Sequence, residues 1–238
     1  MGTARDIRIR GSEIKFLVTP DVAAGIRQWA RTHLDRDPHG SGAHGDEYET
    51  TSVYFDTVNH DVFHRRGSFG RSKYRIRRYG NADAAFLERK MRGAIVLAKR
   101  RTTAEIATLD RLAFADIDPE WPGYWFHRRV IARQLRPVCQ VSYHRMARLI
   151  TMNGDVVRLT LDSDLHARAL RDVRFLRPSG ASITDGRSIL ELKFVGPAPT
   201  LFRSLVERFS LTPQTASKYR LGLASITREV SAAEGLRA

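Results

Sequence analysis

Polar and hydrophobic residues alternate in residues 72–80, and this pattern predicts a β-strand with one apolar and one charged face. Tyr74 and Ile76 fall on the apolar face. The charged face carries Lys73, Arg75, Arg77 and Tyr79. Cations at every second position of a strand repel one another unless an anion lies above them. The strand therefore predicts a surface that binds a negatively charged partner.

Four other segments repeat this design, with apolar residues on one face and charged residues on the other. Their charged faces carry Glu13 and Lys15, Glu88 and Lys90, Arg158 and Asp162, and Glu191 and Lys193. One such strand alone is usually a solvated face, or a face that contacts nucleic acid. Because five strands in one chain share the pattern, we interpret these faces as the lining of a common lumen.

Hydrophobic periodicity and turn residues predict the remaining elements. Strands are predicted over residues 7–18, 48–57, 72–79, 86–91, 95–102, 137–150, 156–165, 169–176 and 188–195. Helices are predicted over residues 20–34, 59–66, 199–209 and 215–226, with irregular helix over 104–135. Loops are predicted over 35–47 and 178–186, and hairpin turns at Arg92-Gly93 and Asn153-Gly154.

These elements predict an α+β fold in a single domain over residues 1–238, with a core from about residue 10 to about residue 226. The simplest arrangement is an antiparallel β-sheet closed on itself as a barrel. Helices would pack outside on its apolar face, and its charged face would line the lumen. An ordinary small barrel instead fills its interior with apolar side chains, so this lumen requires a charged ligand.

Composition supports a polyanionic ligand. The chain of 238 residues has a formal net charge of +14 and a pI of about 10.6, which favours nucleic acid, anionic membrane or phosphate chains as partners. Its single cysteine excludes a disulfide framework, so we expect a reducing compartment and a cytoplasmic location. Few aromatic residues lie on the charged faces, which disfavours single-stranded RNA.

The few carboxylates of the lumen suggest a metal site. Glu13, Glu88 and Glu191 would be ligands for Mg²⁺ or Mn²⁺, which bridge carboxylate and phosphate oxygens. Arginine binds phosphate through two parallel hydrogen bonds, and lysine adds a point charge. The chain has no glycine-rich P-loop, so side chains would have to hold any nucleotide. These are the parts that phosphoryl transfer requires.

Nine short motifs in this order resemble the polyphosphate polymerase domain of the VTC (vacuolar transporter chaperone) family, a branch of the triphosphate tunnel metalloenzymes with the CYTH-like fold. The motifs are Ser-Val-Tyr-Phe-Asp-Thr (52–57), Asn59…Phe63…Arg66, Tyr-Arg-Ile-Arg-Arg-Tyr-Gly (74–80), Phe-Leu-Glu-Arg-Lys (86–90), Ala-Lys-Arg-Arg (98–101), Ser-Tyr-His-Arg (142–145), Arg-Leu-Thr-Leu-Asp (158–162), Leu-Glu-Leu-Lys-Phe (190–194) and Ser-Lys-Tyr (217–219). The resemblance spans residues 10–224.

The resemblance implies an eight-stranded antiparallel tunnel that transfers the ATP γ-phosphoryl group to a growing polyphosphate chain with a divalent metal. It implies that nine cations hold phosphates: Lys15, Arg75, Arg77, Lys90, Lys99, Arg145, Arg158, Lys193 and Lys218. Of these, we expect Arg75, Arg77, Lys90, Arg145 and Arg158 to take part in catalysis. Glu191 would be the principal metal ligand, with Glu88 and Glu13 as weaker ligands. Lys73 is expected at the rim of the tunnel.

One departure from the wider superfamily leaves alternatives open. The related hydrolases and cyclases begin with Glu-x-Glu-x-Lys, whereas this chain has Gly11 in place of the first glutamate. This disfavours the hydrolase and cyclase branches. The alternatives are an inorganic or nucleoside triphosphatase on the same fold and a non-catalytic polyphosphate-binding protein. The eukaryotic polymerases belong to membrane complexes, so the resemblance leaves room for a separate membrane-protein partner and a peripheral location at the membrane.

Overall fold

A single antiparallel sheet organises the protein. The computed structural model describes residues 7–9, 11–92 and 97–235. Its strands are β1 (Ile7–Ile9), β2 (Ser12–Val18), β3 (Asp35–Arg36), β4 (Glu47–Asp56), β5 (Ser72–Tyr79), β6 (Ala84–Arg92), β7 (Leu97–Glu105), β8 (Arg136–Met152), β9 (Asp155–Ala169), β10 (Ala181–Ser182) and β11 (Ser188–Phe194). They pair in the order β1-β7-β6-β5-β4-β8-β9-β11-β2, with β3 on β8 and β10 on β9. The α+β class is therefore confirmed.

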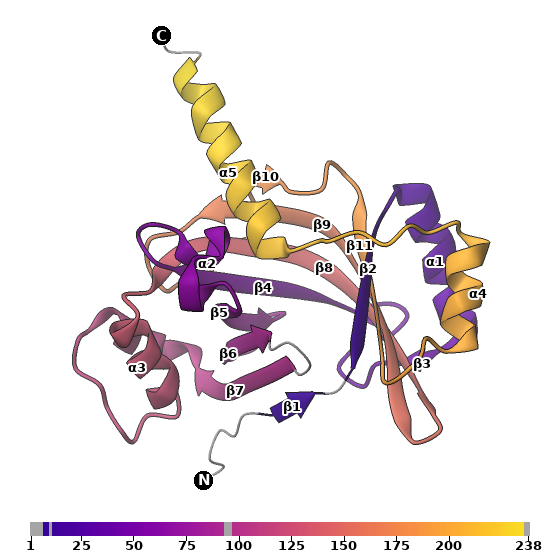
Figure 1. The fold of residues 1–238 in the computed structure, drawn as a ribbon, viewed down its shortest axis with the longest axis horizontal. Helices are drawn as coiled ribbons and strands as arrows, with labels where there is room; N and C mark the ends of the chain where they lie inside the picture. Colours follow the sequence, from indigo (N-terminus) through magenta and orange to yellow (C-terminus); the bar gives the residue numbers. More distant parts are fainter. Residues whose placement is uncertain (1–6, 10, 93–96, 236–238) are drawn as a thin grey trace.

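The sheet curls strongly but does not close into the barrel that we expected (Figure 1). We expected one strand over residues 7–18, but this segment splits. Its first part, β1, pairs with β7 at one edge of the sheet, and its second part, β2, pairs with β11 at the other edge. The sheet of the described residues therefore contains eleven strands with two edges, in place of eight in a closed ring.

Helices cover the apolar outer face at both ends of the curled sheet (Figure 1). The helices and 3-10 turns are α1 (Pro20–His33), α2 (Asp61–His64), η1 (Gly67–Phe69), η2 (Ile106–Ala113), α3 (Tyr124–Ala132), α4 (Thr200–Arg208) and α5 (Lys218–Gly235). Pro20 begins α1, where a missing amide hydrogen costs nothing because it has no partner within the helix. Ile26 and Trp29 of α1 then pack with Phe202 of α4 in one buried cluster. None of the described helices is long and apolar enough to cross a membrane.

The opposite end of the sheet has its own core. Val53 and Ile76, from β4 and β5, pack against Phe126 of α3 and Leu109 of η2. A third cluster lies beneath α5, where Tyr219 and Leu223 contact Val141 of β8. The helices therefore enclose the sheet from outside, and the apolar alternation that predicted its strands faces them.

Most predicted elements are confirmed, and two differences concern the segment after β9. A strand was expected over residues 169–176, but only Ala169 belongs to a strand, and the rest of that stretch is irregular. The predicted loop 178–186 instead contains the short strand β10. Gln140 explains the irregular segment, because its amide side chain bonds the backbone of Leu176 and so replaces a strand partner. The predicted turn residue Gly93 lies outside the described residues.

Candidate functional site

A cavity of about 330 Å³ lies on the concave side of the sheet. Strands β2, β5, β6, β7, β9 and β11 contribute to its wall. Its charged lining residues are Glu13, Lys73, Arg75, Glu88, Lys90, Lys99, Arg158 and Lys193. Val156, Phe194 and Val195 add an apolar section. The predicted charged faces of five strands therefore meet around one space, as the alternation indicated, and Lys73, which we expected at the rim, is part of the lining.

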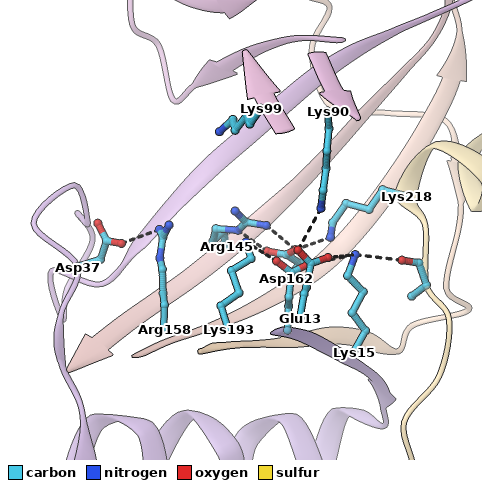
Figure 2. Close-up of polar contacts among 12 residues, drawn as sticks. Glu13, Lys15, Asp37, Lys90, Lys99, Arg145, Arg158, Asp162, Lys193 and Lys218 are labelled. Atoms are coloured by element: carbon cyan, nitrogen blue, oxygen red, sulfur yellow. Dashed lines mark hydrogen bonds and ion pairs between the residues drawn. The ribbon is translucent and has the colours of Figure 1, made fainter. Parts of the chain in front are cut away.

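One ion pair spans this cavity. Lys90 Nζ on β6 lies 3.1 Å from a carboxylate oxygen of Glu13 on β2. These strands are not neighbours in the sheet, so the pair joins opposite walls (Figure 2). Burial of Lys90 lowers its pKa more than Glu13 raises it.

Lys15 binds the two carboxylates of the β2–β11 wall together. Its Nζ lies 2.9 Å from Glu13 and 3.1 Å from Glu191, and Lys193 lies 2.5 Å from the second oxygen of Glu191. Glu191 and Lys15 are directly opposite in the strand register. Burial opposes ionisation of Glu191, but Lys193 and Lys15 outweigh it and hold its pKa well below the usual value. The same carboxylates raise the pKa of Lys15 against the effect of its burial.

Glu88 is the centre of a second ion-pair cluster, on β5, β6 and β7. Its carboxylate lies 2.6 Å from Arg75, 2.9 Å from Lys99 and 3.1 Å from Arg101. Glu88 is directly opposite Arg75 on one neighbouring strand and Arg101 on the other. Burial would raise the pKa of Glu88, but Arg75, Arg77 and Lys99 hold it far below its ordinary range. Glu88 is therefore ionised at neutral pH.

Three other predicted phosphate-binding cations are held by partners around this cavity. Arg145 and Lys218 both bind the fully buried Asp162, at 2.6 Å and 2.5 Å. Arg158 binds Asp37 at 2.6 Å (Figure 2). It also donates to the hydroxyl of Tyr48. Of these three, Arg158 belongs to the cavity lining. Asp162 thus holds Arg145 of β8 and Lys218 of α5 together. Asp162 lies on β9, four residues after Arg158.

Arg77 is buried, and it lies on the same face of β5 as Arg75. Its Nε donates to Ser52 Oγ at 3.1 Å, and its guanidinium lies 5.9 Å from the centre of the Tyr79 ring. Burial would raise the pKa of the Tyr79 hydroxyl, but Arg77 and Arg101 outweigh it and lower that pKa to about 8. Arg77 therefore extends the positive surface beyond Arg75.

Sequence reasoning missed three residues of this site. Arg101 had a signal, because it alternates with Lys99 on the charged face of β7, but the resemblance did not single it out. Asp37 had none, because it lies in a polar stretch that we expected to be a flexible loop. Tyr48, at the start of β4, was likewise not singled out, and its role depends on Arg158 from a distant strand.

The three predicted metal ligands do not gather into one group. Among the described residues, no cluster of three or more His, Cys, Asp or Glu side chains has the spacing of a metal site. Glu13 and Glu191 lie close together, since both contact Lys15 Nζ, whereas Glu88 belongs to the separate cluster with Arg75. Mg²⁺ is commonly held by one or two carboxylates together with substrate phosphates. The Glu13–Glu191 pair fits that requirement, whereas Glu88 lies apart from the pair and is bonded to Arg75, Lys99 and Arg101.

Comparison with known proteins identifies the fold and the family of the chain. No curated protein matches the chain. Many solved structures share its fold, including the two that follow. A candidate adenylate cyclase from Bacillus halodurans has a TM-score of 0.52 at 18% identity, covering 88% of this chain and 95% of that one. A candidate adenylyl cyclase from Hippeastrum, described as having a dominant triphosphatase activity, has a TM-score of 0.50 at 13% identity, covering 91% and 96%. A family model, the VTC domain, matches residues 10–227, so the chain belongs to the VTC domain family.

Proposed function

We propose that this protein is a metal-dependent polyphosphate polymerase, which transfers the γ-phosphoryl group of ATP to a growing polyphosphate chain. The carrying observation is the excess of positive charge in the cavity. Six of its lining residues are cations and two are carboxylates. A cavity with this balance is suited to an extended phosphate chain, because each phosphate supplies the anion that the wall lacks.

The chain's own residues would bind and orient the two substrates. Arg75 of β5 and Arg158 of β9 present guanidinium groups to the cavity, and Lys90 of β6 and Lys193 of β11 add point charges. Held in this way, a terminal phosphate of the polymer can lie in line with the γ-phosphate of ATP. The cations also stabilise the charge that spreads over the transferred group. These side chains are largely preorganised for substrate, because ion pairs hold them in place before it binds.

Glu13 and Glu191 would hold Mg²⁺ or Mn²⁺. When bound there, the metal would neutralise phosphate oxygens and favour departure of ADP. Lys15 now occupies the space between these carboxylates, so its amine would turn toward phosphate when the metal binds. Glu88 would serve a different purpose, as the anion that holds Arg75 and Lys99 in position.

A triphosphatase on the same fold is the second candidate. It is favoured by the likeness to the Hippeastrum protein, whose described dominant activity is that of a triphosphatase. The same cations would bind a triphosphate, and water would replace the end of the polymer as the acceptor. The two activities differ in acceptor alone, so the products distinguish them.

Glu191→Ala tests the metal assignment. We expect turnover of ATP in the presence of Mn²⁺ to fall by about 100-fold or more, because the main ligand of the metal is gone. Binding of tripolyphosphate, measured by calorimetry without metal, should persist, because the cations remain. The control is Asp172→Ala, which removes a carboxylate from an exposed ion pair with Arg174 and should leave both quantities unchanged. Unchanged turnover in Glu191→Ala would show that Glu191 does not hold the metal.

A further inference from the structure

Three lysines lie side by side across the wall of the cavity. Lys73 of β5 is directly opposite Lys90 of β6, and Lys90 is directly opposite Lys99 of β7. Like charges in such cross-strand positions are destabilising unless anions compensate them. Glu13 compensates Lys90 at 3.1 Å, and Glu88 compensates Lys99 at 2.9 Å. Within the described part of the chain, Lys73 makes no ion pair with a carboxylate.

Lys73 instead contacts the start of α5. Its Nζ donates to Ser217 Oγ at 3.0 Å. Ser217 directly precedes α5, and its Oγ also lies 3.5 Å from the backbone nitrogen of Arg220. Backbone N–H groups in the first turn of a helix favour a nearby anion. Lys73 therefore lies between the cavity that it lines and a helix end that also attracts negative charge.

The strongest electrostatic influences on Lys73 come from positive groups. Arg75 comes from its own strand, Lys90 from β6, Lys15 from β2 and Arg220 from α5. Glu13, which also lines the cavity, is already bonded to Lys15 and Lys90. Burial and these four cations lower the pKa of Lys73 to about 7.

We propose that Lys73 and Ser217 form a phosphate subsite, and that binding of a phosphate group there is coupled to uptake of a proton by Lys73. The inference rests on the proposed function, since it takes phosphate chains as the ligand. The hydroxyl of Ser217 would donate to the phosphate, and Lys73 would gain the anion that its neighbours already have. At pH 8 the free site holds Lys73 largely uncharged, and an anionic phosphate beside it restores the charge.

Calorimetry with tripolyphosphate tests this coupling. The wild type, Lys73→Arg and Lys73→Met are titrated at pH 6.5 and pH 8, in buffers of different ionisation enthalpy. Arginine keeps its charge at both pH values. The proton uptake measured for Lys73→Arg therefore comes from the ligand and from the rest of the site. We expect the wild type at pH 8 to take up nearly one proton more than Lys73→Arg. Its affinity should fall about tenfold more than that of Lys73→Arg between pH 6.5 and pH 8.

Lys73→Met provides the second arm. It should bind more weakly than the wild type at pH 6.5 and should lose the extra proton uptake at pH 8, while its circular dichroism stays that of a folded protein. Equal proton uptake by the wild type and Lys73→Arg would overturn the subsite and leave the proposed function standing. Absence of tripolyphosphate binding by the wild type would overturn both.

Discussion

Asp162 shows how single residues prepare this site. It is fully buried, yet it holds two cations, because Arg145 donates to both of its oxygens and Lys218 binds one of them. Burial alone would raise the pKa of Asp162, but Arg145 and Lys218 lower it to about 2. The carboxylate thus fixes one guanidinium and one ammonium group where phosphate is expected, and it neutralises part of their charge.

Asp162→Asn should destabilise the protein by about 3–5 kcal/mol at pH 7, because it leaves two buried cations without their anion. Urea denaturation measures this difference. The folded-state pKa of Asp162 lies below its ordinary 3.8, so its contribution to stability is present above about pH 4 and is lost as the pH falls toward 2. The difference in free energy of unfolding between the wild type and Asp162→Asn should therefore become smaller as the pH falls from about 4 toward 2.

The control for this substitution is Asp172→Asn, in an exposed ion pair with Arg174, which should change stability by less than about 0.5 kcal/mol. A variant Asp162→Asn as stable as the wild type at pH 7 would contradict the view that Asp162 compensates Arg145 and Lys218.

Alternation along strands indicated many residues of this kind, and the resemblance added Lys218 from a helical segment. Arg75, Lys15 and Glu191 were found through alternation. Arg75 lines the cavity, and Lys15 pairs with both Glu191 and the lining residue Glu13. Asp37 was not found, because its pairing with Arg158 depends on how a loop folds back on the sheet. Glu88 was found, but its surroundings were not foreseen, since only the register places it between Arg75 and Arg101.

At the scale of elements, Asp56 ties two helices to the end of β4. Its carboxylate accepts the backbone N–H groups of Val62 at 2.8 Å and Phe63 at 2.9 Å, in α2. It also accepts the hydroxyl of Tyr219 in α5. Tyr219 is next to Lys218, so this anchor sets where α5 presents its first residues to the site.

Tyr219→Phe should therefore lower the free energy of unfolding by about 1–3 kcal/mol, because Asp56 remains buried and loses a hydrogen bond. It should also weaken tripolyphosphate binding several-fold, as Lys218 loses its fixed position. Denaturation and calorimetry measure the two effects. Tyr124→Phe, on α3, is the matched control, since no hydrogen bond of its hydroxyl is seen in the described structure. Full stability and affinity in Tyr219→Phe would show that the anchor does not position α5.

The elements also show where sequence reasoning stops. Alternation and turn residues predicted β4, β5, β8 and β11 closely, because each strand has one apolar face against the helices. They did not predict that residues 7–18 divide between two edges of the sheet. Alternation records which face a side chain takes, but the partner of a strand depends on distant segments. For that reason the prediction of a closed ring of eight strands was wrong in detail, whereas the prediction of a charged concave face was correct.

At the scale of the whole molecule, fold and charge point to the same ligand. The chain belongs to the VTC domain family and has a net charge of +14. Part of this positive charge lies on the inner face of the curled sheet. Ion pairs hold most of the lining cations. Lys73 instead donates to Ser217, and we propose that it binds a phosphate. Both proposed activities use this surface to bind a phosphate chain, and they differ in whether polymer or water accepts the phosphoryl group.

Time-resolved ³¹P NMR of the purified protein with ATP and Mg²⁺ tests the central claim most directly, because it distinguishes internal phosphates of a chain from orthophosphate. We expect the signal of internal polyphosphate groups to grow in step with ADP, and we expect Glu191→Ala to show neither. Growth of orthophosphate in equal amount to ADP, with no internal chain signal at any time, would contradict the polymerase.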